Sequence, residues 1–262
     1  MTAGTASCVD VFLACQRAIV NRQLIRRTSA TDKEFHFQDW FARRLGEAGA
    51  LYDQRGRNSY PDFTLVRSAE GYEVKGLAWP GREATYDANS QAPTGLHNGR
   101  TIYYVFGRYP AGASESDYPV VDLILCHGDF LNAQHEYVHQ NKSFKGFGSY
   151  GDIMIRDRKM YVAPTPFALA TGTTGQRTLI IPEGGAVDDR LEPVGRLVRV
   201  EAARLVLGYE FDLPSNTLTP RYGDNPDAGK AHPFAAYRAH GEADPPVSLV
   251  AAGGPTGVLA EE

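Results

Sequence analysis

The sequence predicts a mixed α/β domain in which a central β-sheet is flanked by helices. Two observations carry this prediction. Apolar residues recur at helical spacing through the first fifty residues, and after Pro61 the repeat changes to the two-residue period of a strand. The chain has 262 residues, 42% of them hydrophobic, which is enough to bury one sizeable core without disulfides.

Two helices are expected before Pro61. The first covers residues 8–27. The second begins near Thr31, because Thr31-x-x-Glu34 fits a capping box, and Gly49 is a residue type that commonly ends a helix.

After Pro61 strands and loops dominate, with one further helix expected from Asp129 to about Gln140. Strand-like stretches also lie within residues 177–222, and whether they form an added subdomain is left open. The other expected strands cover residues 63–66, 72–77, 101–108 and 120–126, and a hairpin over 153–162 turns at Asp157-Arg158.

The chain changes character at Asp224, because Ala, Gly and Pro dominate from there onward without periodicity. Such a composition is typical of flexible segments. We therefore expect a domain over residues 1–223 and a flexible tail over residues 224–262.

Composition limits the classes of function. The formal net charge of −4 argues against a protein that coats nucleic acid nonspecifically. Cys8, Cys15 and Cys126 are odd in number and form no C-x-x-C pair, so a secreted disulfide framework is not expected. No apolar run approaches the roughly 20 residues that span a bilayer. We expect a cytoplasmic protein with no membrane partner.

The expected hairpin between Pro61 and Gly76 carries the most chemical information. Alternate residues of a strand share a face, so Glu73 and Lys75 point to one side, with their Cα atoms roughly 6.5–7 Å apart. The turn folds the preceding strand back, which brings Asp62 beside Glu73. Two carboxylates and one lysine then converge at one edge of the sheet.

Two carboxylates at this distance repel each other, so a cation is expected to neutralise them. Mg²⁺ takes one or two carboxylates and fills its other positions with water and phosphate oxygens. It acidifies bound water and stabilises the charge of a phosphoryl transition state. Lys75 can orient or deprotonate the attacking water, or neutralise charge on the phosphate. The chemistry indicated is in-line hydrolysis of a phosphodiester.

These residues resemble a known family. Pro61-Asp62, ten intervening residues and Glu73-x-Lys75 are similar to the PD-(D/E)xK motif of nucleases, among which type II restriction endonucleases are closest in size. The resemblance implies a restriction-endonuclease-like core and an endonuclease that acts on double-stranded DNA with Mg²⁺, commonly as a homodimer. It implies metal ligation by Asp62, Glu73 and the Val74 carbonyl, and a catalytic role for Lys75.

The same resemblance implies a further catalytic glutamate on an N-terminal helix. Glu34 is the candidate, because it shares a helical face with Phe37 and Phe41 and its carboxylate can reach inward. A purely structural role for Glu34 in the capping box stays equally open.

Two polar segments are expected to bind the DNA: the loop after Lys75 and a basic stretch near residue 142. In the major groove Asn and Gln suit adenine and Arg suits guanine, while backbone contacts position the duplex. The residues predicted to contact DNA are Arg82, Asn89, Gln91, His97, Arg100, Lys142 and Lys145.

Two alternative functions remain open. His135-Glu136-Tyr137-Val138-His139 matches the H-E-x-x-H pattern of zinc metallopeptidases, although Lys142 stands where the extended motif has glycine. The other alternative is a DNA-binding module without catalysis, in which the carboxylates of the hairpin are structural.

Overall fold

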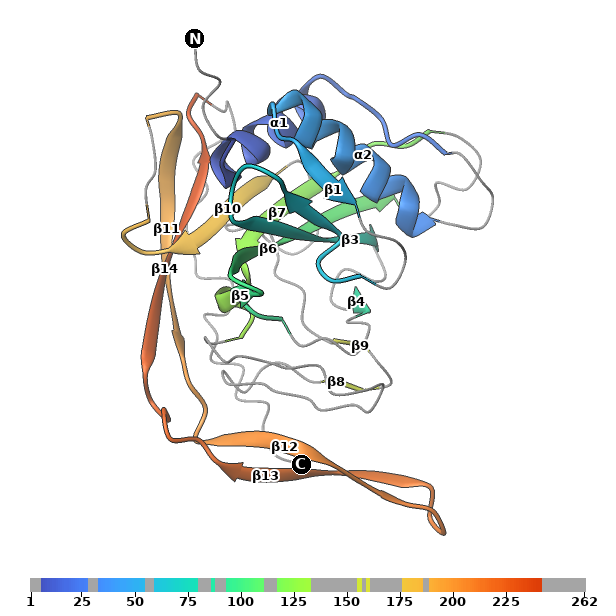
Figure 1. Ribbon diagram of the computed structural model, residues 1–262, viewed down its shortest axis with the longest axis vertical. Helices are drawn as coiled ribbons and strands as arrows, with labels where there is room; N and C mark the ends of the chain where they lie inside the picture. The colour runs from blue at the N-terminus through green and yellow to red at the C-terminus, as the bar shows by residue number, and fades with distance from the viewer. Residues whose placement is uncertain are drawn as a thin grey trace.

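A nine-stranded mixed β-sheet forms the centre of the described molecule, and two α-helices lie against one of its faces (Figure 1). The expected α/β class, with a central mixed sheet and flanking helices, is confirmed. The structure, a computed structural model, describes residues 6–27, 33–54, 59–79, 86–87, 93–110, 117–132, 155–156, 159–160, 176–185 and 189–241.

The two helices are α1 (Cys8–Val20) and α2 (Lys33–Glu47). In front of α1, the Asp10 carboxylate accepts a hydrogen bond from the backbone N–H of Ser7 at 2.9 Å, which satisfies one of the donors at the helix start. Helix α1 is shorter than the expected range of 8–27. Helix α2 ends before Gly49, whose φ of 75° places it in the left-handed region that a C-terminal glycine commonly adopts. Among the described residues, no helix is long and apolar enough to cross a membrane.

The described chain contains far more strand than helix. Those of the large sheet are β1 (Tyr52–Gln54), β2 (Phe63–Leu65), β3 (Glu70–Trp79), β5 (Leu96–His97), β6 (Arg100–Pro110), β7 (Asp122–His127), β10 (Arg177–Pro182), β11 (Leu191–Val200) and β14 (Ala231–Ala239). Two smaller sheets contain β4 (Tyr86–Asp87), β8 (Ile155–Arg156) and β9 (Lys159–Met160), and β12 (Arg204–Asp212) and β13 (Thr217–Asp224).

The large sheet has the order β1-β2-β3-β6-β7-β10-β14-β11, with β5 paired to the start of β6. Two of its pairs, β3 with β6 and β7 with β10, are parallel, and the others are antiparallel. Strand β3 runs along β6 over its whole length, from Glu70 opposite Thr101 to Trp79 opposite Pro110. The site described below lies on this long parallel pair of strands.

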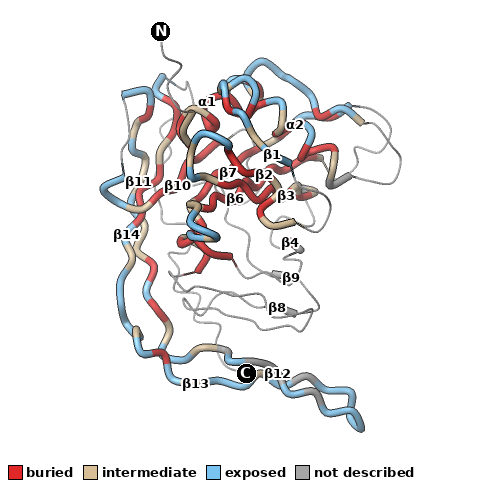
Figure 2. The backbone as a smooth tube through the Cα atoms, viewed as in Figure 1, coloured by how far each residue is buried: buried red, intermediate tan, exposed pale blue. Residues whose placement is uncertain are grey.

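The two faces of the sheet differ in chemistry. The helical face is apolar: Val74, Val105 and Leu125 pack there against Phe12 of α1 and Phe37 of α2. The second face carries apolar side chains such as Ile124 and Ile180, but it also carries charged groups. Figure 2 shows the buried residues concentrated in the central strands and on the inner sides of the helices.

One buried ion pair shows the mixed character of the second face. Arg108 Nη1 lies 3.1 Å from Asp122 Oδ1, and the two residues are opposite each other on β6 and β7. Both side chains are almost completely buried. The second face therefore holds charges away from water.

The expected flexible tail begins too early. Residues 231–239 form β14, which lies inside the sheet between β10 and β11. Small side chains suit this place, because Ala235, Ala236 and Ala239 are buried there. The tail prediction is therefore wrong as far as Gly241, and residues 242–262 lie outside the described part of the chain.

Other expectations have mixed outcomes. The predicted hairpin at 153–162 is confirmed, since β8 and β9 pair antiparallel on either side of the predicted turn. Where the predicted helix is expected to begin, at Asp129, the structure has a short 3-10 turn, η1 (Gly128–Phe130); the rest of that prediction, residues 133–140, lies outside the described residues. The stretch 177–222 supplies strands to the central sheet and also the separate β12–β13 pair.

The contact between α2 and the sheet yields a stability prediction. Gly76 and Gly107 are opposite each other on β3 and β6, and the Phe37 ring lies over both, so a Cβ at Gly107 would collide with that ring. We expect Gly107→Ala to lower the free energy of unfolding by about 1–3 kcal/mol, as overpacking of a core does. The measurement is urea unfolding.

Gly46 in α2 is the matched control, because a Cβ there meets no atom of the described residues within 4 Å. Gly46→Ala is expected to raise the free energy of unfolding by up to about 1 kcal/mol through helix propensity. Equal stability of Gly107→Ala and the unchanged protein would show that Phe37 does not seal this part of the sheet.

Candidate functional site

The predicted hairpin is present, and its two strands end at different points. Strands β2 and β3 pair antiparallel with Phe63 opposite Tyr72, so Asp62, one residue before β2, lies at the level of Glu73. Strand β3 continues beyond this point while β2 does not. Asp62 therefore lies at the point along β3 where the described pairing with β2 ends.

The backbone of β3 holds the Asp62 carboxylate in place. The N–H of Val74 donates a hydrogen bond to Asp62 Oδ2 at 2.8 Å, and the N–H of Asp62 donates to Glu73 Oε2 at 3.3 Å. The N–H and C=O of one strand residue point to the same side of the strand. The Val74 carbonyl is thus directed toward the edge at which Asp62 lies, as its predicted role requires.

Lys75 and Glu73 form an ion pair on the second face. Lys75 Nζ lies 2.6 Å from Glu73 Oε1, and both residues are only 5% exposed. Removing two charges from water costs several kcal/mol per ion, and good geometry is needed to offset that cost. The structure therefore brings Asp62, Glu73 and Lys75 together, as the sequence pattern predicted.

Three tyrosines surround this ion pair, and none of them was predicted from the sequence. Tyr104 is opposite Glu73 on β6, its hydroxyl lies 3.2 Å from that of Tyr60, and the Tyr86 ring packs against both Tyr104 and Phe106. Burial, and next to it the charge of Glu73, raises the pKa of Tyr60. Burial also raises the pKa values of Tyr86 and Tyr104, so all three phenols keep their protons.

Tyr86 differs from the other two phenols. Its hydroxyl is buried and finds no hydrogen-bond partner among the described residues, although a buried hydroxyl without a partner costs roughly 1–3 kcal/mol. Such a donor can bind an acceptor oxygen supplied by a ligand. Tyr60 stands directly before Pro61 and could have been found from the motif, whereas Tyr86 and Tyr104 depend on the register between strands.

The end of the long polar loop is fixed near the site. The N–H of Gly95 donates to Asp129 Oδ1 at 3.0 Å, and Asn132 Nδ2 donates to the Pro93 carbonyl at 3.3 Å. His97, a predicted DNA contact, lies edge-on to Tyr60 with ring centroids 4.9 Å apart. Burial lowers the pKa of His97, which favours its neutral form.

Arg100, another predicted DNA contact, has a structural partner. Its Nη1 donates to the carbonyls of Leu65 and Ser68 at 2.8 and 2.9 Å, which ties the turn between β2 and β3 to the start of β6. A role of Arg100 in DNA binding stays a prediction.

The remaining predicted residues lie outside the part of the chain that can be described. The backbone of Glu34 is in the first turn of α2, but its side chain is not among the described ones. The H-E-x-x-H segment 135–139 also lies outside. The same holds for Arg82, Asn89, Gln91, Lys142 and Lys145.

The donor set at the site suits a hard cation with few protein ligands. Within the described ranges, no group of three or more His, Cys, Asp and Glu side chains is arranged to hold a metal ion. Mg²⁺ commonly uses only one or two carboxylates. Asp62, Glu73 and the Val74 carbonyl offer two carboxylates and one neutral oxygen at one sheet edge, so the residues present fit Mg²⁺.

Comparisons of the chain with models of known protein families, with curated protein sequences and with solved structures find no match. A functional conclusion therefore depends on the geometry of Asp62, Glu73 and Lys75 and on the chemistry of these groups.

The buried ion pair yields a second prediction. Lys75→Met leaves the buried Glu73 without its cationic partner, so we expect the free energy of unfolding at neutral pH to fall by about 3–5 kcal/mol. The double variant Glu73→Gln/Lys75→Met removes both charges and is expected to recover most of that loss. Urea unfolding of the single and double variants measures both effects.

A third prediction concerns pH. His127, at the end of β7, has a side chain that is only 12% exposed, and it accepts a hydrogen bond at Nδ1 from the N–H of Asp129 at 3.2 Å. Burial lowers the pKa of His127 to about 4, although the Asp129 carboxylate lies 3.6 Å away. The unfolded chain takes up a proton near pH 6.5, and the folded chain does so only near pH 4. The contribution of His127 to stability is thus complete above pH 6.5 and falls, by at most about 3 kcal/mol, as the pH drops to 4.

Urea unfolding at several pH values between 4 and 7 tests this prediction. His127→Gln is expected to show a flatter loss of stability over that range, because glutamine does not titrate there. Parallel pH profiles for the two proteins would mean that His127 is not held neutral by burial.

Proposed function

We propose that this protein is a Mg²⁺-dependent DNA endonuclease that hydrolyses phosphodiester bonds. The observation that supports the proposal is the meeting of Asp62 and Glu73 with Lys75 at the point where β2 stops and β3 continues. These are the three residue types, in the order and spacing, by which the sequence resembles PD-(D/E)xK nucleases.

Each group has a defined task in this proposal. Asp62, Glu73 and the Val74 carbonyl would hold the metal ion, which when bound lowers the pKa of water and stabilises charge on phosphate oxygens. The ammonium of Lys75 shares Glu73 with the metal site and would orient the attacking water or stabilise negative charge on the phosphate. Tyr86, whose buried hydroxyl has no hydrogen-bond partner within the described part of the chain, would donate it to a ligand oxygen.

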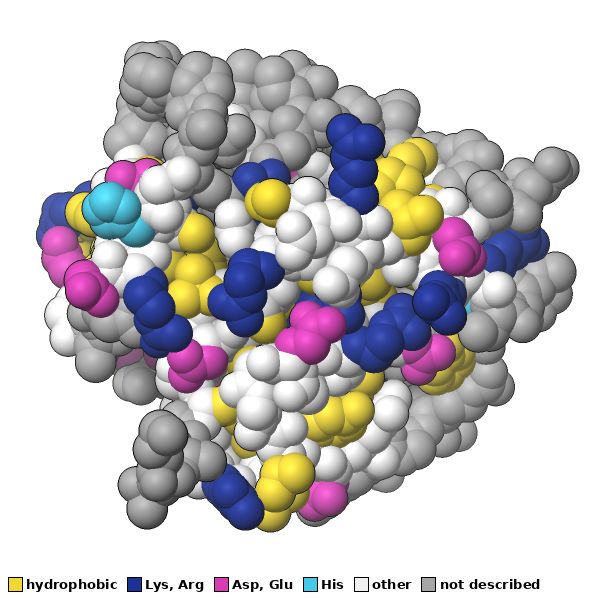
Figure 3. Space-filling view, turned by 90° about the horizontal axis from the view of Figure 1, so that it is seen from above, with side chains coloured by type: hydrophobic (Ala, Val, Ile, Leu, Met, Phe, Trp, Pro, Cys, Tyr) yellow, Lys and Arg dark blue, Asp and Glu magenta, His cyan; other side chains and the backbone are white. Residues whose placement is uncertain are grey.

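The charge distribution supports an approach of DNA from the second face. Glu73 and Lys75 belong to that face, whereas the helices cover the opposite one. Seen from the side of the helices, acidic and basic side chains alternate over the described surface, without a broad patch of positive charge (Figure 3). A backbone that carries one negative charge per phosphate is not attracted to such a surface.

Sequence-specific cleavage in the manner of a type II restriction enzyme is the finer form of the proposal. It involves base contacts from the predicted loop residues and a homodimer that cuts both strands. His97 supports it, because its ring lies beside Tyr60 at the margin of the site.

A plasmid-cleavage assay with Mg²⁺ tests the proposed function. The unchanged protein is expected to convert supercoiled plasmid to discrete linear fragments. The double variant Glu73→Gln/Lys75→Met is expected to lose at least about 10²-fold in rate, because it lacks one metal ligand and the lysine. This variant is preferred to Lys75→Ala, since it leaves no unpaired buried charge.

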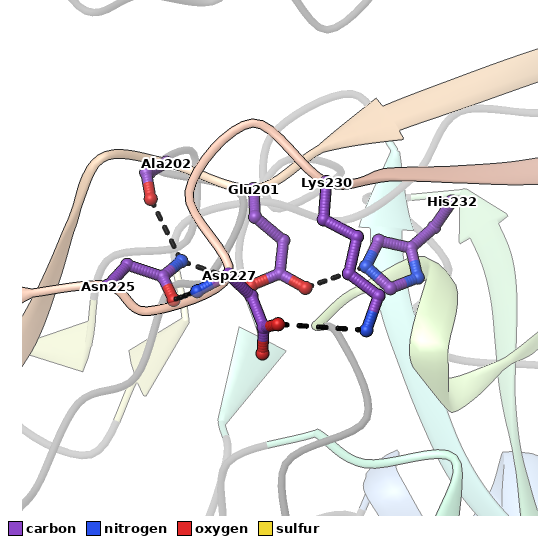
Figure 4. Close-up of polar contacts among 6 residues, drawn as sticks. All are labelled: Glu201, Ala202, Asn225, Asp227, Lys230 and His232. Carbon is purple, nitrogen blue, oxygen red and sulfur yellow. Dashed lines mark hydrogen bonds and ion pairs between the residues drawn. The ribbon is translucent and has the colours of Figure 1, made fainter.

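Lys230→Ala is the matched control, because Lys230 is exposed and its Nζ lies 3.8 Å from Asp227 Oδ1 at the surface (Figure 4). It is expected to cleave at the normal rate. Cleavage by the double variant at the normal rate would overturn the mechanism, and salt-sensitive DNA binding by the unchanged protein without cleavage in any divalent ion would favour the non-catalytic alternative.

A further inference from the structure

A small sheet of the strands β4, β9 and β8, residues 86–87, 159–160 and 155–156, lies apart from the large sheet, and we call it the cover. Strand β9 is its middle strand and pairs antiparallel with both β4 and β8. In Figure 1 these strands follow one another away from the large sheet, on the side opposite the helices, and β4 contacts β3. The cover is therefore on the second face, next to the strand that carries Glu73 and Lys75.

Tyr86 of β4 anchors the cover to the large sheet. Its ring packs edge-on against Phe106, with ring centroids 5.1 Å apart, and lies tilted against Tyr104 at 6.4 Å. The register of β3 with β6 places Tyr104 opposite Glu73. The same register places Phe106 opposite Lys75. The Tyr86 ring thus contacts the β6 neighbours of both members of the buried ion pair.

The site is closed to a large substrate in this structure. Glu73 and Lys75 are each 5% exposed and Tyr86 is 1% exposed, so even water reaches little of these side chains. A phosphodiester within a duplex carries nucleotides on both sides, and it cannot reach Lys75 Nζ while the site is closed in this way. Cleavage at this site therefore requires that an element over it moves aside.

The ring and the hydroxyl of Tyr86 act on the cover in opposite directions. The ring favours the closed cover, because opening would expose apolar surface to water. The hydroxyl favours the open cover, because it is buried without a hydrogen-bond partner among the described residues and would gain water as a partner. The described ladders of the cover are two residues long, so its opening need not disturb the pairing of β3 with β6. Such a part of a fold opens at a lower free energy than the whole molecule unfolds.

We propose that the cover opens locally, with Tyr86 as its anchor, and admits the phosphodiester to the second face. The opening is a property of the fold, whereas the identity of the group that enters rests on the proposed function. Lids that close over an active site exclude water during the reaction and open for binding and for release of product.

Cys126 reports this opening from within the chain. It lies on the second face, opposite Tyr104 on β6, and is completely buried. It is close enough to Tyr86 that its charge would affect the pKa of that phenol. Burial raises the pKa of the Cys126 thiol, so it reacts little with disulfide reagents while it is covered. The other two cysteines, Cys8 and Cys15, lie on the helical face and are removed by Cys8→Ser/Cys15→Ala.

The rate at which dithionitrobenzoate modifies Cys126 in this background, at several urea concentrations below the unfolding transition, tests the proposal. Local opening exposes little surface, so the rate is expected to be nearly independent of urea. Tyr86→Phe removes the unpartnered hydroxyl from the closed state and is expected to slow the modification at least about 5-fold. Tyr86→Ala removes the ring and is expected to accelerate it at least about 100-fold.

Tyr109→Phe is the matched control, because Tyr109 is a buried tyrosine of β6 on the helical face. It is expected to leave the rate below the unfolding transition unchanged. A rate that rises steeply with urea throughout would show that Cys126 is reached only by global unfolding, and the proposal would be wrong. Equal rates for the unchanged Tyr86 protein and both Tyr86 variants would place the opening elsewhere, which also overturns it.

The plasmid assay separates this inference from the proposed function. If DNA enters beneath the cover, Cys126 that carries the reagent is expected to reduce cleavage at least about 10-fold, and a thiol reductant is expected to restore it. Cleavage at the normal rate by the modified protein would show that DNA does not enter there. Local opening in a protein that cleaves no DNA leaves the opening intact and overturns only the proposed function. Cleavage by a protein whose Cys126 reacts only on global unfolding overturns only the opening.

Discussion

The buried ion pair between Glu73 and Lys75 is the constraint on which the site depends. Its two charges are almost completely removed from water, and replacement of such pairs by apolar residues is often neutral or stabilising. Packing alone therefore does not explain why β3 carries a glutamate and a lysine in this place. Asp62, held by the Val74 N–H, adds a second carboxylate to the same edge, which makes the arrangement costly unless a cation or a ligand completes it.

The two faces of the sheet have different roles: one packs the core, and the other carries the chemical groups of the site. The helical face is closed by aromatic and aliphatic side chains, and Phe37 fits so closely over Gly76 and Gly107 that no larger residue is accommodated at Gly107. The second face can hold charges, since phenols and ion pairs supply polar partners within the apolar surface. Because side chains alternate along a strand, β3 contributes to both faces of the sheet. Val74 packs in the core, while Glu73 and Lys75 lie at the site.

The residues of the motif could be predicted from the sequence because their geometry is local. Asp62, Glu73 and Lys75 lie on one hairpin, and strand alternation with antiparallel register brings them together. Tyr104 could not be predicted in the same way, because its place opposite Glu73 follows from the parallel pairing of β3 with β6. Strand β14 was missed for a related reason. Its alanine-rich sequence is typical of a flexible segment, and its place in the sheet follows from pairing with β10 and β11, which are distant in sequence.

The site and the β12–β13 pair belong to different sheets, and β14 follows directly after that pair in the chain. Strands β6, β7 and β10 lie between β3 and β14, so roughly 19 Å of sheet separates the site from β14. Substitutions in β12 or β13 are therefore not expected to disturb Glu73 or Lys75 directly. The β12–β13 pair extends on the side of the large sheet opposite the helices, which is also the side to which Glu73 and Lys75 belong (Figure 1).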